Sequence, residues 1–266
     1  MDAQCSLGIS GLEYPHWPLQ KIADLAVSLQ ASFVELGVSR ITREGVDVVL
    51  RECQARHLTV EVNSPSSEIA VGMATAQRLG SPYVILLDDA IERPDSSRAQ
   101  CIEGFRRTMV ELLEKPGLEG MKVALENGGF RITRDPQDVL AIVRAINHPR
   151  FGVNYDPDNY YNAGFEGFPY AYELVRGHIF HMHAKDSARY IPEVHGDGKR
   201  VLHRASGNLI CVPLGTGAVN WAGLADRLRR DGYSGPVSLE PHKLPHEMAP
   251  GMEADAAFLR RVGLVA

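Results

Sequence analysis

Short apolar runs alternate with amphipathic stretches along the whole chain. Eight runs rich in Val, Ile, Leu or Phe predict strands buried on both faces of a parallel sheet, at residues 6–10, 33–37, 58–63, 83–87, 122–126, 152–156, 179–184 and 236–240. Helical spacing of apolar positions predicts helices at residues 19–30, 43–56, 68–79, 97–114, 135–146, 169–175, 221–230 and 253–262. A strand is therefore followed by a helix from one end of the chain to the other.

This alternation predicts an α/β protein with the (β/α)8 TIM-barrel fold. Eight units of about 33 residues suit that fold, which needs roughly 250 residues. An open doubly wound sheet is the alternative, but Gly-Ile-Ser-Gly at residues 8–11 does not form the G-x-G-x-x-G turn typical of it. Since no linker or repeat divides the chain, we expect residues 1–266 to form one domain. The longest irregular segment, residues 187–217, has a length typical of functional loops or lids.

Composition excludes several classes of partner. The 266 residues are 44% hydrophobic and 23% charged, with a formal net charge of −5, as in ordinary soluble globular proteins. The chain has no basic run to bind nucleic acid, and no apolar run of the roughly 18 residues that cross a bilayer. The four cysteines are widely spaced and no secretory signal pattern is visible. We therefore expect reduced thiols and a cytoplasmic location.

Polar side chains end four of the predicted strands. Glu126, Asp156 and Glu240 follow apolar residues in three of them, and His183 lies near the end of another. Such ends converge on one face of a barrel, where three carboxylates would repel one another. A divalent cation removes that repulsion, and this donor set suits Mn²⁺, Mg²⁺ or Co²⁺, with Zn²⁺ also acceptable. The alternative is a buried ion-pair network that uses Lys185 and nearby arginines.

Five segments resemble the successive signatures of the xylose-isomerase-like TIM-barrel superfamily: VALENG, GVNYDPDN, HMHAKD, PLGTGAVNW and GYSGPVSLE. The group includes sugar-phosphate isomerases and epimerases, ketose 3-epimerases, hydroxypyruvate isomerases, inosose dehydratases and apurinic endonucleases. The resemblance runs from about residue 6 to the final helix. It implies one divalent ion, with Mn²⁺ first among the candidates, bound by Glu126, Asp156, His183 and Glu240. It also implies that the two glutamates act as the acid/base pair, as in the ketose epimerases.

Two asparagines depart from the patterns of particular members. Apurinic endonucleases hold three metal ions with extra histidines, at places where this chain has Asn63 and Asn159. The ketose 3-epimerases tend to have histidine at the position of Asn159, so their sugar contacts do not transfer directly. The resemblance therefore argues against a nuclease and leaves the substrate open.

The reaction implied is that of a divalent-metal-dependent sugar isomerase or epimerase, which abstracts an α-proton beside a carbonyl through a metal-stabilised enediolate. The main alternative is a metal-dependent dehydratase, a lyase that expels a β-hydroxyl of a keto-polyol or related ring. Remote alternatives are an apurinic endonuclease-like phosphodiesterase and a non-catalytic sugar-binding barrel. The expected partner is a small sugar or polyol, with no nucleic acid and no membrane. Homo-oligomerisation is left open.

Further residues near these strand ends are candidates for contact with the substrate: Trp17, Glu35, Asn159, His181, Lys185 and Arg204. His181 and Lys185 share the inward face of His183 because side chains alternate along a strand. Four of the six have an alternative role. Trp17 would be an ordinary packing residue. His181 and Glu35 would be hydrogen-bonded groups inside the barrel, and Lys185 would pair with a carboxylate ligand.

The segment Leu-Gly-Thr-Gly at residues 214–217 offers backbone N–H groups near the last two strands, where barrels often bind phosphate. The sequence shows no basic cluster to accompany them. An unphosphorylated sugar or cyclic polyol is therefore the favoured substrate.

Overall fold

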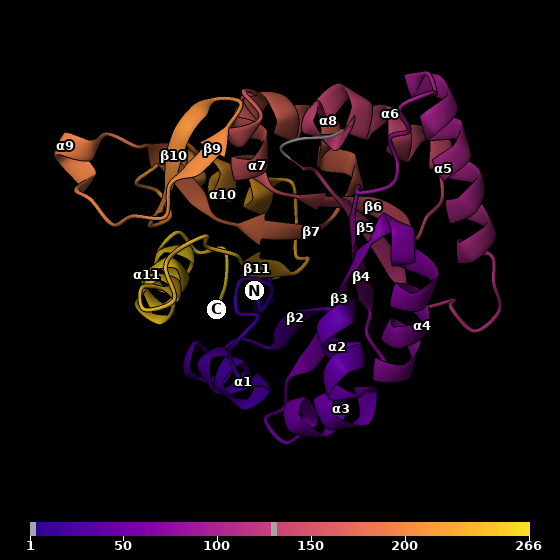
Figure 1. The fold of residues 1–266 in the computed structure, drawn as a ribbon, viewed down its shortest axis with the longest axis horizontal. Helices are drawn as coiled ribbons and strands as arrows, with labels where there is room; N and C mark the ends of the chain where they lie inside the picture. The colour runs from indigo at the N-terminus through magenta and orange to yellow at the C-terminus, as the bar shows by residue number, and fades with distance from the viewer. Residues whose placement is uncertain (1–3, 129–131) are drawn as a thin grey trace.

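Eight parallel strands close into a barrel in the computed structural model, which describes residues 4–128 and 132–266 (Figure 1). In their order around the barrel, the strands are β1 (Leu7–Ser10), β11 (Val237–Leu239), β7 (Ile179–Ala184), β6 (Phe151–Tyr155), β5 (Lys122–Glu126), β4 (Tyr83–Leu87), β3 (Thr59–Pro65) and β2 (Phe33–Gly37). The prediction of a (β/α)8 barrel is confirmed. The mouth of the barrel, where the strands have their carboxyl ends, carries the polar residues described below.

Helices cover the outside of the barrel: α1 (Leu19–Ser28), α2 (Val38–Glu44), α3 (Val46–Gln54), α4 (Ile69–Leu79), α5 (Arg98–Leu113), α6 (Pro136–Ile146), α7 (Pro157–Asn162), α8 (Tyr172–Val175), α10 (Trp221–Arg230) and α11 (Met248–Arg261). The single helix predicted at residues 43–56 is wrong, because α2 and α3 are separate. Gly45 divides them with φ of +90°, a conformation that glycine adopts readily and other residues rarely do.

Residues 186–212 form an arm that projects from the barrel (Figure 1). It contains a second, antiparallel sheet in the order β8-β10-β9, and a short helix, α9, lies at its far end. The bounds of these elements are β8 (Asp186–Arg189), α9 (Pro192–His195), β9 (Leu202–Arg204) and β10 (Gly207–Val212). Most of this segment was expected to be irregular. That expectation is wrong because the arm's strands are short and partly exposed, so they lack the apolar runs of barrel strands.

The inside of the barrel is largely polar, whereas the apolar core lies between strands and helices. In β2, Val34 and Leu36 are buried toward the helices, and Glu35, which alternates with them, points inward and is also fully buried. Side chains on β3, β6 and β7 add further inward polar groups. No helix among the described residues is long and apolar enough to cross a membrane.

Candidate metal centre

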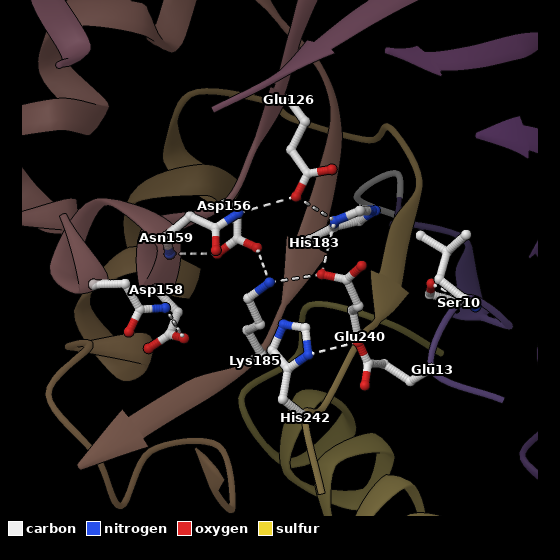
Figure 2. A network of polar contacts seen from close by, with 12 residues as sticks. Ser10, Glu13, Glu126, Asp156, Asp158, Asn159, His183, Lys185, Glu240 and His242 are labelled. Carbon is white, nitrogen blue, oxygen red and sulfur yellow. Dashed lines mark hydrogen bonds and ion pairs between the residues drawn. The ribbon is translucent and has the colours of Figure 1, made fainter. Parts of the chain in front are cut away.

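Four strands deliver three carboxylates and one imidazole to the barrel mouth. Glu126 ends β5, Asp156 and Glu240 directly follow β6 and β11, and His183 lies in β7. One ligand atom from each lies within 4.8 Å of the others, and all four residues are buried. Figure 2 shows their side chains turned toward one another. We call these four residues the mouth cluster. The structure thus brings together the residues that the sequence predicts as metal ligands.

Hydrogen bonds at the ends of β5 and β6 fix the carboxylate of Asp156. Its Oδ1 accepts the backbone N–H of Asn159 at 2.9 Å and so caps the first turn of α7, where Pro157 needs no hydrogen bond. The side chain of Asn127 binds the backbone N–H and carbonyl of Asp156, both at 2.8 Å. These contacts leave Oδ2 of Asp156 directed at the cluster.

The ring of His183 is held from below by Glu35. Nε2 of His183 donates to Oε2 of Glu35 at 2.8 Å, and Oε1 of Glu35 accepts from the amide of Asn63 at 3.0 Å. Nδ1 then faces Glu126 and Glu240 at 3.3 and 3.2 Å. Burial lowers the pKa of His183, but the negative charges of Glu240, Glu35 and Glu126 raise it well above its usual value. The space around Nδ1 therefore attracts positive charge.

The two glutamates of the mouth cluster differ in protonation. Burial raises the pKa of Glu126, and the negative charge of Glu240 adds to that effect. Burial acts in the same direction on Glu240, but the positive charges of His183 and Lys185 hold the pKa of Glu240 well below its usual range. Glu126 thus favours its protonated form more than Glu240 does.

Lys185 contributes the one ammonium group inside the mouth cluster among the described residues. Its Nζ lies 2.8 Å from Oδ2 of Asp156 and 2.6 Å from Oε2 of Glu240. Three ionised carboxylates against one ammonium leave a formal charge of −1 when His183 is protonated, and of −2 when it is neutral, as it must be to bind a metal. Oε2 of Glu126 is buried and has no hydrogen-bond partner in the described part of the chain. The ion pairs therefore balance only part of the cluster, and the donor set fits a divalent cation.

A second group, which consists of Glu35, His181 and His183, also has ligand atoms close together. Its atoms already have protein partners. His181 lies 2.8 Å from Oε2 of Glu61 through Nε2 and 2.9 Å from Oδ1 of Asn154 through Nδ1. His181 and Glu35 are fully buried, one layer below the mouth. The structure thus places His181 and Glu35 in hydrogen bonds with protein groups, the arrangement that was the alternative to substrate contact.

The other residues predicted to contact substrate lie in three different elements. Asn159, in α7, donates to Oε1 of Glu126 at 3.0 Å and so holds the side chain of a candidate ligand. Trp17 is half-buried in the loop after β1, where its ring stacks on Tyr14 with centroids 4.3 Å apart. Arg204 lies in β9 of the arm, near enough to Asp158 for the two charges to interact.

The backbone N–H groups of residues 214–217 are taken by the protein itself. Those of Gly215 and Gly217 both donate to Oδ2 of Asp186 at 3.0 Å, and that of Val219 donates to Oδ1 at 3.1 Å. Asp186 is fully buried. A phosphate role for this segment therefore does not fit, because an internal carboxylate already occupies the anion position.

Two residues at the rim were not predicted as site residues. Glu13, in the loop after β1, lies 2.8 Å from Nδ1 of His242 and also pairs with Arg200 of the arm. Burial alone would raise the pKa of Glu13, but these two partners lower it to about 2. The sequence held one signal for His242: it follows Glu240 by two residues, and side chains two residues apart in an extended segment point to the same side.

Comparison with known proteins gives consistent results for the fold. Three similar solved structures are a D-allulose 3-epimerase from Methylomonas sp. (14% identity, 98% of both chains, TM-score 0.76), the probable 3-DHS dehydratase AsbF from Bacillus anthracis (16%, 96% of this chain and 98% of that one, 0.72) and the IOLI protein with a bound zinc atom (18%, 98% of both, 0.72). A search of curated proteins gives no match. A family model described as xylose isomerase-like TIM barrel matches residues 6–262. The closed barrel and this match over nearly the whole chain show that the protein belongs to the xylose isomerase-like TIM-barrel family.

Proposed function

We propose that the protein is a divalent-metal-dependent isomerase or epimerase of a ketose or related keto-polyol. The observation that carries this proposal is the mouth cluster, in which Glu126, Asp156, His183 and Glu240 meet at the ends of four strands. The similar structures support it, since one is titled a ketose epimerase and another holds zinc. Mn²⁺ is the expected ion, with Mg²⁺, Co²⁺ and Zn²⁺ as the other candidates.

The two glutamates approach from different sides of His183. In the order around the barrel, β11 is next to β7 on one side, and β5 lies on the other side with β6 between, so Glu240 and Glu126 come from opposite flanks. A bound divalent cation would act as a Lewis acid for the carbonyl oxygen of the substrate. One glutamate removes the proton on the carbon beside the carbonyl, and the other returns a proton to the opposite face. Return of the proton to the neighbouring carbon would instead convert the ketose into an aldose.

Several neighbours orient this pair. Asn159 holds Oε1 of Glu126, which leaves the partner-free Oε2 for proton transfer. Lys185 fixes Oε2 of Glu240 and, in the presence of substrate, can turn its ammonium toward a substrate oxygen. Glu35 keeps Nδ1 of His183 directed at the carboxylates.

Dehydration of a keto-polyol or related ring is the second candidate. It begins with the same proton abstraction and then expels a β-hydroxyl group. The likeness to a structure titled as a probable 3-DHS dehydratase favours keeping it. The two reactions separate by product mass, because dehydration lowers it by one water.

Metal content of the purified protein tests the proposal first. We expect about one Mn, Co, Mg or Zn per chain by elemental analysis, lost in Glu240→Ala and His183→Ala but kept in His181→Ala, whose partners lie one layer lower. Ketoses incubated with the holoenzyme in D₂O should then exchange their α-proton. No metal in the wild type, together with no thermal stabilisation by Mn²⁺ or Co²⁺, would make the cluster a structural charge network and refute the proposal.

A further inference from the structure

A basic cavity of about 440 Å³ lies between the arm and α11, beside the barrel mouth. The arm contributes Lys199 and Arg200 to its wall, and the segment after β11 contributes His242, Lys243 and His246. Among the described residues that line it, Glu247 is the one acidic side chain. Glu13 at the rim adds a second carboxylate through its pair with Arg200, so three permanent cations face two carboxylates and the wall keeps a small excess of positive charge, although the chain as a whole carries −5.

The cations of the basic cavity differ in how far they are neutralised. Lys199 lies 2.6 Å from Oε1 of Glu247, and Arg200 pairs with Glu13 at the rim. Lys243 makes no hydrogen bond or ion pair with any residue that the structure describes. Its aliphatic stem packs over Gly251, where a Cβ would come within 2.7 Å of it. Gly251 thus makes room for a half-buried lysine whose ammonium is not held in an ion pair by any described residue, although it is near enough to Asp255 to lower the pKa of that carboxyl.

The basic cavity adjoins the mouth cluster through His242. This residue lines the cavity and follows Glu240 by two positions. In Figure 2 its ring lies next to Lys185 and Glu240, and its Nδ1 is directed to Glu13. A small molecule with its reacting carbons at the cluster would therefore direct its far end toward the cavity.

We propose that the basic cavity binds an anionic group of the substrate, a carboxylate or a phosphate, with Lys243 as its principal charge partner. The inference rests on the proposed function and narrows its substrate from ketoses in general to sugar acids or sugar phosphates. It reverses the preference for a neutral sugar, which relied on the apparent lack of a basic cluster. The cations come from residues 199–200 and 242–246, so folding alone brings them together.

Direct binding tests the site without turnover. Calorimetry at near-physiological salt uses inorganic phosphate and D-gluconate as anionic probes, with D-sorbitol as the neutral counterpart of gluconate. We expect at least one anion to bind, sorbitol not to bind, and Lys243→Gln to weaken the anion about tenfold or more. Lys243→Arg should retain binding, and Lys115→Gln, which changes an exposed lysine before β5, should match the wild type. Binding of neither anion, equal affinity for sorbitol and the anion that binds, or unchanged anion binding in Lys243→Gln would overturn the inference.

Proton exchange in D₂O separates this inference from the proposed function. The substrates are D-fructose, D-fructose 6-phosphate and 5-keto-D-gluconate, so the preferred one identifies phosphate or carboxylate as the anion. We expect kcat/KM for one anionic ketose to exceed that for D-fructose at least about tenfold, and Lys243→Gln to remove the difference. Equal exchange of all three would overturn the anion subsite and leave the metal-dependent reaction standing. If the protein holds no metal and exchanges no proton but still binds an anion through Lys243, the metal-dependent reaction is refuted and the anion subsite stands.

Discussion

Glu35→Gln removes the charge that orients the proposed histidine ligand while it preserves the shape of the side chain. Oε2 of Glu35 accepts the Nε2 proton of His183 at 2.8 Å, and the carboxylate is fully buried. Burial would raise the pKa of Glu35, but the charge and hydrogen bond of His183 lower it, so this partner is ionised. Replacing such a partner of a ligating histidine typically weakens metal binding 10- to 100-fold, about 1.4 to 2.7 kcal/mol.

The assay is a Mn²⁺ titration against a competing chelator, and the chain offers a matched control. Oε2 of Glu61 makes the same 2.8 Å contact with Nε2 of His181, one layer deeper and equally shielded from solvent. Glu61→Gln should therefore keep the metal affinity within about threefold of the wild type, while Glu35→Gln loses at least tenfold. An equal loss in both variants would mean that general disturbance of the barrel interior is responsible. Wild-type affinity in Glu35→Gln would refute the orienting role outright.

Three further predictions concern the mouth cluster and the barrel exterior. Glu126→Gln and Glu240→Gln should each lower α-proton exchange by a factor of about 10²–10⁴ and keep most of the bound metal; exchange at the wild-type rate in either would contradict the acid/base assignment. Lys185→Met should destabilise the metal-free protein by about 3–5 kcal/mol, because it leaves two buried carboxylates without their ammonium partner. Mn²⁺ should restore much of that loss when unfolding by urea is measured. An equal loss of stability with and without Mn²⁺ would argue for a purely structural network. Burial raises the pKa of Asp255 from 3.8 to about 6, so its contribution to stability is complete below pH 4 and falls as pH rises to about 6. Asp255→Asn, which keeps an oxygen for the N–H of Leu214, should gain about 2 kcal/mol relative to the wild type between pH 4.5 and 7.5, and parallel pH curves for the two proteins would exclude this cause.

The eight barrel strands could be predicted because each is buried on both faces and so reads as a continuous apolar run. The candidate ligand positions came from the same pattern, because polar residues such as Glu126 end four otherwise apolar strands. Register then places Ser238 beside His183, so Glu240, two residues further along the chain, projects into the mouth. Local pattern and barrel geometry together were sufficient for this part of the site.

Contacts between distant positions could not be predicted in this way. Glu35 and His183 are 148 positions apart, and nothing in either local sequence specifies that pairing. The arm was missed because its strands pack on one face and lack a continuous apolar run. The basic cavity was missed for a related reason: Lys199 and Lys243 lie in different segments, and only the fold of the arm over α11 makes them neighbours.

The polar layers inside the barrel differ in how their charges are balanced. In the lower layer, His181 has a partner at each ring nitrogen and one carboxylate, that of Glu61, beside it, although Nδ2 of Asn154 has no partner among the described residues. At the mouth, three carboxylates share one lysine and one histidine, and Oε2 of Glu126 has no partner among the described residues. Unbalanced buried charge costs stability, so a fold that needed only a rigid interior would gain by replacing these groups with apolar ones. Their position at the open end, beside a cavity with its own unpaired lysine, is what binding of a cation together with an anionic substrate would require.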